Sequence, residues 1–98
     1  MSMRSALELE VLGSVGDDYE APHTIASDIA RETGRSITEI EVRAVLLALA
    51  RSGLVQAYAY DAEAARYRPI TYDEAVRIHD AWFMSTAAGA EELQRHAS

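Results

Sequence analysis

The stretch that decides the fold is TIASDIARETGRSITE, residues 24–39. Its first half repeats isoleucine and alanine at helical spacing, and Thr24 is a typical N-cap for that helix. Gly34 is the residue type that ends helices, and Ser36 with Glu39 forms the capping-box pattern that opens the next one. Two helices separated by only about three residues predict a sharp helix-turn-helix corner.

A further helix is expected before this corner. Residues 5–15 place Val11 and Val15 on one apolar stripe together with Leu7. The helix that follows the corner carries a run of apolar residues and is expected to end at Gly53. The sequence therefore predicts three helices in succession.

A β-hairpin is predicted next. Valine and tyrosine alternate over residues 54–60, residues 65–70 are again extended, and residues 61–64 form the turn between them. A lone hairpin is unstable, so it must lie against the helices. We expect an α+β, mostly helical winged helix-turn-helix, with three helices, a two-stranded wing and a long C-terminal helix.

The C-terminal helix is predicted from a second capping box, formed by Thr71 and Glu74. It is expected to run to about Arg95, with Gly89 as a possible weak point. Ninety-eight residues fit a single domain. Within residues 1–98, we assign residues 5–70 to the helix-turn-helix and wing, and residues 71–96 to a dimerisation helix.

The predicted last helix carries more apolar surface than one core needs. Its spacing places Ile78 and Trp82 on one stripe and Phe83 on a neighbouring stripe, while Leu9 lies off the buried stripe of the first helix. We expect these four residues to form a homodimer interface. The alternative is that the region of Trp82 and Phe83 wraps the core of its own monomer.

Three segments resemble a known family. TIASDIA at residues 24–30, LARSGLV at residues 49–55 and YRPIT at residues 67–71 are similar to winged-helix transcriptional regulators, the PadR-like group especially. The resemblance implies a DNA-binding regulator, expected to be a repressor, that acts as a homodimer. It covers most of the chain through short hydrophobic spacings, so it indicates fold better than function.

The resemblance also implies which residues contact double-stranded DNA. The start of the third helix would enter the major groove, so that Arg35, Ser36, Thr38 and Arg43 face the bases. Glu39 is expected to complete the capping box, although a carboxylate can also accept a hydrogen bond from cytosine.

The second strand of the wing adds two further candidates. Arg66 and Arg68 alternate and so project from one face, where they either reach phosphates or form an ordinary solvated surface. Tyr58, Tyr60 and Tyr67 are expected to be cross-strand neighbours that stabilise the hairpin by packing.

The charge of the chain opposes DNA binding. The net charge is −7, and all nine basic residues are arginine. An acidic body repels phosphates unless its cations gather on one face. A second hypothesis is therefore an acidic winged-helix protein-interaction module that does not bind DNA. Convergence of Arg35, Arg43, Arg66 and Arg68 on one face would favour the DNA-binding regulator.

Other classes of function find little support in the sequence. The chain has no cysteine, which excludes disulfides and thiolate chemistry. His23, His79 and His96 lack the spacing of metal ligands, and no catalytic motif is present, so we expect no enzyme and no cofactor. No apolar run of about 18 residues occurs. We expect a cytoplasmic protein without a membrane partner.

Overall fold

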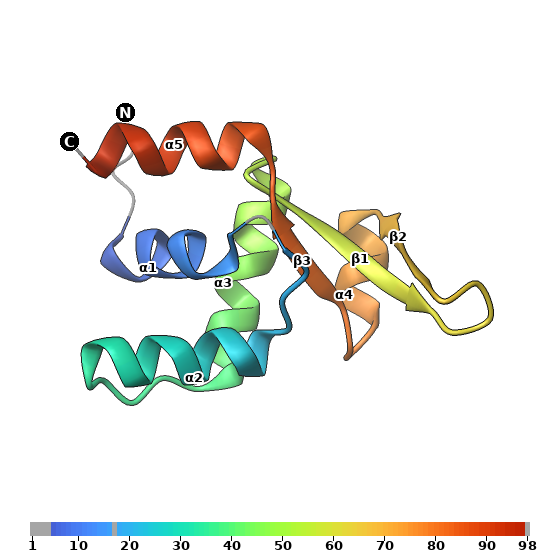
Figure 1. Cartoon of the computed structure of the whole chain (residues 1–98), viewed down its shortest axis with the longest axis horizontal. Helices are drawn as coiled ribbons and strands as arrows, with labels where there is room; N and C mark the ends of the chain where they lie inside the picture. Colours follow the sequence, from blue (N-terminus) through green and yellow to red (C-terminus); the bar gives the residue numbers. More distant parts are fainter. Residues whose placement is uncertain (1–4, 17, 98) are drawn as a thin grey trace.

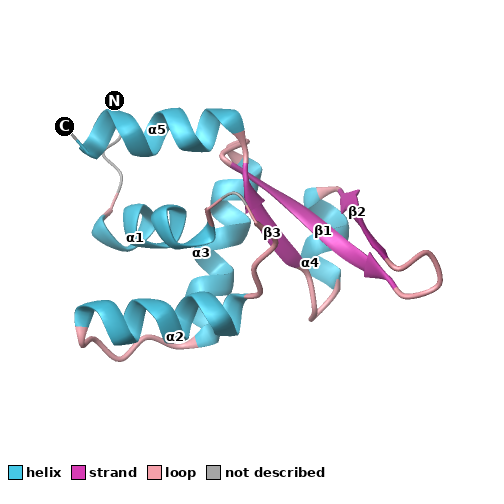
Figure 2. Cartoon of the chain, viewed as in Figure 1, coloured by secondary structure: helices cyan, strands magenta, loops and turns pink. Residues whose placement is uncertain are grey.

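The computed structural model describes residues 5–16 and 18–97 and shows a mostly helical α+β fold (Figures 1 and 2). The described elements are α1 (Ala6–Val15), α2 (Pro22–Thr33), α3 (Glu39–Arg51), β1 (Val55–Asp61), β2 (Arg66–Ile70), α4 (Tyr72–Arg77), β3 (Trp82–Ser85) and α5 (Ala87–Ala97). The three strands form one antiparallel sheet in the order β2-β1-β3. This architecture is compatible with the winged-helix class.

The helices surround a core that lies between them and one face of the sheet. Figure 1 shows α1 between α2 and α5, with the β1–β2 hairpin extending away from the three-helix end of the molecule. The largest fully buried side chains come from α1, α2, α3 and β3. They are Val11, Leu12, Val15, Ile25, Ile29, Val42, Leu46, Leu49 and Phe83.

The capping box of α3 uses Thr38 and Glu41 rather than the predicted Ser36 and Glu39. The Thr38 hydroxyl accepts the Glu41 N–H at 3.1 Å, and the Glu41 carboxylate accepts the Thr38 N–H at 3.2 Å. Both pairs have the required spacing, so the local pattern alone does not choose between them. The later start leaves Ile37 just before the cap, where it packs against the core in the manner of a hydrophobic staple.

The start of α2 also differs from the prediction. The helix begins at Pro22, so Thr24 is not its N-cap; Ala21 takes that position without a side-chain hydrogen bond. Proline suits the first helical turn, because its φ is preset and its missing N–H costs no helical bond. At the other end the prediction is confirmed: Gly34 adopts a left-handed conformation with φ 72°, and its N–H bonds the Ala30 carbonyl.

The predicted hairpin forms, and the sheet gains a third strand that was not predicted. Tyr60 lies opposite Tyr67 in the β1–β2 pair, and Ala57 lies opposite Phe83 in the β1–β3 pair. The outer edge of β3 meets the loop that precedes α2. There Glu20 and Phe83 exchange both backbone hydrogen bonds at 2.9 Å.

The prediction of one helix from Thr71 to about Arg95 is wrong. The Thr71 capping box forms, but α4 ends at Arg77, and a strand and a second helix follow. Phe83 is fully buried while its neighbours in β3 are half-buried, which is the alternation of a strand. A short apolar run fits either helical or strand periodicity, so long-range pairing with β1 decides the conformation.

The start of α5 passes directly over the end of α3. The Thr86 hydroxyl donates to the Gly53 carbonyl at 2.7 Å and accepts the Gly89 N–H at 3.0 Å, while the Thr86 N–H donates to the Leu54 carbonyl. A Cβ on Gly89 would lie 2.0 Å from the Leu54 carbonyl oxygen. Gly89, predicted as a weak point, is therefore the residue that permits this close approach.

We expect Gly89→Ala to lower the free energy of unfolding by about 2 kcal/mol or more, because the added methyl overlaps backbone that cannot move aside cheaply. Gly13→Ala is the matched control. A Cβ at Gly13 would meet Leu93 at an ordinary 3.8 Å, so this variant should gain about 0.5–1 kcal/mol from helix propensity. Urea denaturation measures both. Equal effects of the two changes would contradict the close approach at Gly89.

Candidate functional site

The loop between α2 and α3 holds three of the predicted DNA contacts, and two of them have partners within the chain. Arg35 forms an ion pair with Glu10 on α1. The Thr38 hydroxyl is occupied as the N-cap of α3, where it bonds Glu41. Ser36 is exposed. The loop therefore presents a neutral hydroxyl and an arginine whose charge is already paired.

Arg43, the predicted reading residue of α3, faces α4 instead. Its guanidinium Nη2 donates to the carbonyl oxygens of Ala75, Val76 and Ile78 at 3.1, 3.0 and 3.0 Å. These carbonyls lie at the end of α4, where no further helical turn supplies N–H donors. Arg43 thus acts as a side-chain cap for α4, and its charge is held against the body of the protein.

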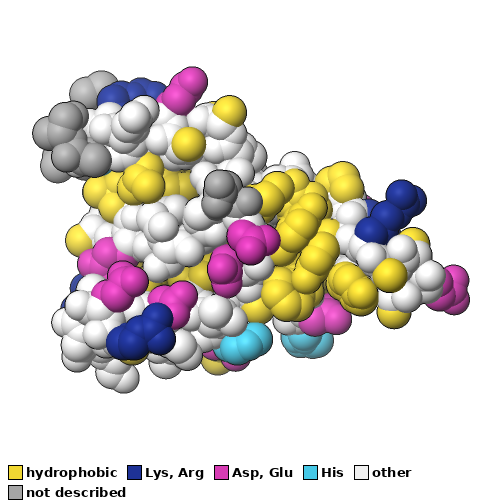
Figure 3. Space-filling model, in the orientation of Figure 1, with side chains coloured by type: hydrophobic (Ala, Val, Ile, Leu, Met, Phe, Trp, Pro, Cys, Tyr) yellow, Lys and Arg dark blue, Asp and Glu magenta, His cyan; other side chains and the backbone are white. Residues whose placement is uncertain are grey.

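Arg66 and Arg68 lie on β2 and are both exposed, as predicted. Arg68 lies 3.7 Å from the Glu74 carboxylate, in a pair that is open to solvent on both sides. Figure 3 shows basic atoms on the hairpin. The hairpin and the loop after α2 lie toward opposite ends of the long axis (Figure 1). Arg35 is therefore separated from Arg66 and Arg68 along the molecule, and Arg43 is bonded to α4.

Acidic groups gather on the face formed by α1, α2 and the loop between them (Figure 3). The pKa of the Glu20 carboxyl is raised above its ordinary value of 4.5, first by burial and then by repulsion from Asp28 and Asp18. The carboxylates of Glu20, Asp18 and Asp28 therefore lie close enough to repel one another. This face is unsuited to a phosphate backbone.

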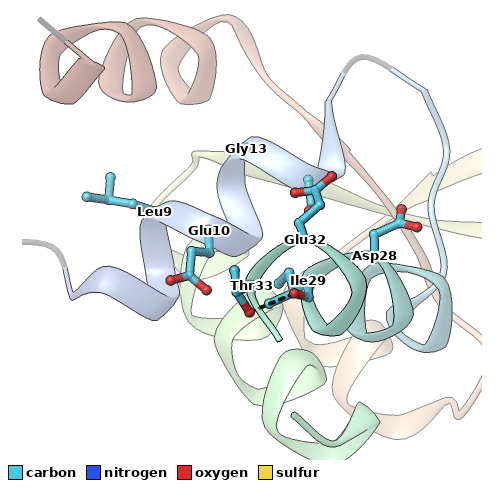
Figure 4. Close-up of a pocket in the computed structure, with 8 residues that line it drawn as sticks. Leu9, Glu10, Gly13, Asp28, Ile29, Glu32 and Thr33 are labelled. Carbon is cyan, nitrogen blue, oxygen red and sulfur yellow. Dashed lines mark hydrogen bonds between the residues drawn. The ribbon is translucent and has the colours of Figure 1, made fainter. Parts of the chain in front are cut away.

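A groove of about 430 Å³ separates α1 from α2 on the same face (Figure 4). Three carboxylates line it, from Glu10, Asp28 and Glu32. Two of them have arginine partners: Glu10 pairs with Arg35, and Asp28 pairs with Arg31 at 2.7 Å. Carboxylates outnumber these cations around the groove, so it adds to the acidic character of the face.

The residues predicted for a dimer interface are dispersed. Phe83 is fully buried in the core of its own chain, so it is not available to a partner. Trp82, its neighbour in β3, lies on the opposite face of the sheet because side chains alternate along a strand. Ile78 is partly buried against the core, and Leu9 lines one end of the groove on α1. The predicted helical stripe does not exist because the helix does not form.

Aromatic side chains cover the outward face of the sheet. Tyr67 is central: its ring stacks on Tyr19 at 4.0 Å and meets Tyr60 and Trp82 edge-on at 5.1 and 5.4 Å. Cross-strand packing of Tyr60 and Tyr67 is confirmed, whereas Tyr58 contacts Tyr19. The rings are in contact with one another, as the packing prediction requires.

Sequence reasoning missed the outward face of α3. Ile40, Ala44, Leu47, Ala48 and Arg51 follow one another along this face, which we call the α3 outer face. The Ile40 side chain is 82 % exposed, Ala44 and Ala48 are exposed, and Leu47 is half-buried. The fully buried residues of α3 lie on another stripe of the same helix, and Leu47, at the border of the two stripes, also packs partly against the core. The positions of the apolar residues around a helical wheel would have shown that α3 has a second apolar stripe in addition to the buried one.

The α3 outer face is apolar from Ile40 to Ala48 and charged at Arg51, where it ends. Glu39 begins the helix and Arg51 ends it, with its guanidinium 5.8 Å from the centre of the Tyr72 ring. An open cavity of about 500 Å³ adjoins the N-terminal half of this face. Its lining residues are Glu39, Ile40, Arg43, Ala44 and His79.

No protein-family model and no curated protein sequence matches this chain. Within residues 5–16 and 18–97, no three histidine or carboxylate side chains are grouped so that they could hold a metal ion. In the same described segments, no helix has the length and apolar character needed to cross a membrane. The family resemblance remains a prediction.

We expect Arg43→Met to lower the free energy of unfolding by about 1–3 kcal/mol, because the α4 carbonyls lose a charged donor while the apolar stem is kept. Arg66→Met, on the exposed strand, should change it by less than about 0.5 kcal/mol. Chemical denaturation of both variants checks this difference. An Arg43 variant as mild as the Arg66 variant would show that α4 does not depend on Arg43.

Proposed function

We propose that this protein is a cytoplasmic protein-interaction module with a winged-helix fold, and that it binds its partner through the α3 outer face rather than binding DNA. One observation carries the proposal. The helix face that would enter the major groove in the regulators that this chain resembles is apolar here, with Ile40 82 % exposed.

The order of elements supports the winged-helix part of the proposal. Three helices are followed by a hairpin, and α2 and α3 meet at a corner that begins with the left-handed Gly34. The hairpin extends beyond the helices, as a wing does (Figure 2). The short helix α4, between β2 and β3, is an addition to the order of three helices and a hairpin.

The charges support a protein partner over DNA. Arg43 is bonded to α4, Arg35 is paired with Glu10, and the first turn of α3 carries Glu39 and Glu41. DNA affinity arises mainly from cations that displace counterions at the phosphates. A reading helix that begins with two carboxylates and holds Arg43 against α4 presents net negative charge to the phosphates at its N-terminal end.

The apolar residues support a binding role for the same face. A single exposed isoleucine is common on protein surfaces and needs no explanation. Here Ile40 is continued by Ala44, Leu47 and Ala48 along the helix, and Val76 on α4 is also exposed, at 45 %. Covering Ile40 alone would contribute about 2 kcal/mol to binding. A helical apolar stripe of this kind is a common element of protein recognition.

The second candidate is the DNA-binding homodimeric regulator. Exposed Arg66 and Arg68 on the projecting hairpin favour it, because a wing can contact phosphates or the minor groove. It differs from the interaction module in requiring nucleic acid at both the hairpin and α3.

A photoreactive benzophenone amino acid at position 44 tests the proposal directly. After irradiation of cells, this variant should be cross-linked to a partner protein. Mass spectrometry of the adduct should identify one defined peptide of that partner. The same amino acid at Ala62, in the exposed hairpin turn, is the matched control. The DNA-binding candidate instead predicts nucleic-acid adducts from both positions, and that result would overturn the interaction module.

A second experiment tests DNA binding: selection of bound sequences from a pool of random DNA duplexes. We expect no enriched site, because few cations face outward together. Enrichment of a palindrome that is lost in the variant Arg66→Ala plus Arg68→Ala would establish the regulator instead.

A further inference from the structure

We propose that the outward face of the β-sheet is a second docking surface, and that it binds a proline-rich segment of a partner protein with an arginine or lysine beside its prolines. This inference goes beyond the α3 outer face, because it concerns a different surface of the molecule. It uses the aromatic side chains of the sheet and a pocket that adjoins them.

The outward face of the sheet is aromatic and uncharged. The strand register fixes which side chains lie on it, and in the three strands that the structure describes none of the outward ones carries a charge. They are Gln56, Tyr58, Tyr60, Tyr67, Pro69, Trp82 and Met84. Tyr19 lies over them from the loop before α2, with its ring stacked on Tyr67 at 4.0 Å. Figure 3 shows hydrophobic atoms gathered over the sheet. We call this surface, with Tyr19, the aromatic face.

The polar groups of the aromatic face are available to a ligand. Within residues 5–16 and 18–97, its tyrosine hydroxyls and the Trp82 indole N–H make no hydrogen bond to another group of the chain. None of them is a buried atom without a partner, so solvent reaches them. A polyproline II helix has no internal hydrogen bonds, so its carbonyls can accept bonds from such donors. The donors of this face therefore match the carbonyls of a proline-rich segment.

The arrangement of the rings suits proline side chains. The Tyr67 ring meets Trp82 at an interplanar angle of 74° and Tyr60 at 66°. Rings at such steep angles present faces and edges in turn, and Tyr60 is 51 % exposed. Proline-rich segments dock on aromatic side chains in this way and lose little conformational entropy on binding, because polyproline II is preformed.

A pocket of about 230 Å³ adjoins the aromatic face at Trp82, which lines it. The carboxylates of Glu39 and Asp80 line the same pocket, together with His23 and His79. In the described part of the chain, neither carboxylate forms an ion pair or a hydrogen bond through its side chain. The pocket therefore places two uncompensated negative charges beside an indole ring.

The arginines of the chain do not fill this pocket. Arg43 lines the neighbouring cavity, and its guanidinium is bonded to the carbonyls of α4. A cationic side chain from a partner can pair with Glu39 and Asp80 while its apolar stem or charged plane lies on the Trp82 ring. Charge complementarity thus favours a basic residue beside the prolines. The same carboxylates and the net charge of −7 oppose a nucleic acid or a second copy as the occupant.

Selection from a displayed library of random peptides, with the full chain as bait, tests the occupant. We expect enrichment of peptides that combine prolines with an adjacent arginine or lysine. A library that yields no enriched peptide overturns the inference. So does an enriched consensus that lacks proline or lacks a basic residue.

The fluorescence of Trp82, the only tryptophan of the chain, reports where the selected peptide binds. Glu39→Gln together with Asp80→Asn should weaken binding about tenfold or more. Glu63→Gln, in the exposed hairpin turn, should leave it unchanged. Circular dichroism confirms that each variant is folded. Equal affinities of these variants would contradict the role of the pocket.

A second pair of variants tests the aromatic half of the site. Tyr60→Ala should weaken binding of the peptide about fivefold or more, because a ring contact is lost. Tyr72→Ala is the matched control, since Tyr72 is a partly exposed tyrosine on α4, outside the aromatic face. A peptide that binds both variants equally well does not lie on the aromatic face.

This inference and the proposed function fail separately. Ile40→Asn alters the α3 outer face and should leave peptide binding unchanged; loss of binding in this variant would place the peptide on α3 and overturn docking on the sheet. Failure of the peptide selection would leave cross-linking from position 44 unaffected. Quenching of Trp82 by single-stranded oligonucleotides, or a fluorescence change on concentrating the protein alone, would identify a nucleic acid or a second copy and overturn the inference.

Discussion

The guanidinium of Arg43 donates to the carbonyls that end α4, and this contact ties α3 to the segment that leads into β3. Arg43 donates hydrogen bonds to the carbonyls of Ala75, Val76 and Ile78. In a longer α4, N–H groups of the next helical turn would bond such carbonyls instead. The backbone is extended at Ile78, with φ −106° and ψ 151°, and the chain then forms β3. Phe83 in β3 then fills the core. The same contact withdraws a cation from the outer surface of α3, so a structural bond determines what that surface can bind.

The α3 outer face is apolar over most of its length and carries a charge at Arg51. Ile40 has no core to enter, because the buried stripe of α3 already packs against α1 and α2. Arg51 and Glu39 stand at the two ends of the helix. The acidic face of α1 and α2, where burial and then repulsion from like charges raise the pKa of Glu20, offers no alternative phosphate site. Packing and electrostatics therefore both favour a protein partner over a nucleic acid.

Local signals in the sequence were sufficient for the helix-turn-helix corner and the hairpin, because Gly34 and the strand alternation act within a few residues. The local signals gave wrong predictions where two patterns fitted the sequence equally well. Ser36 and Thr38 both begin capping boxes, and burial of the preceding isoleucine decides for Thr38. Phe83 fits a helix or a strand until β1 lies beside it. The role of Arg43 was not predictable, since its acceptors lie 32 to 35 residues further along the chain.

The most direct test of this account is an NMR measurement of the arginine side chains in the full chain. If α4 holds Arg43, its Nη protons should give separate signals from slowed rotation, with nuclear Overhauser contacts to Ile78. The exposed Arg66 should give averaged signals in the same spectrum. Averaged signals from Arg43, equal to those of Arg66, would mean that its guanidinium is free to face DNA and would contradict the account.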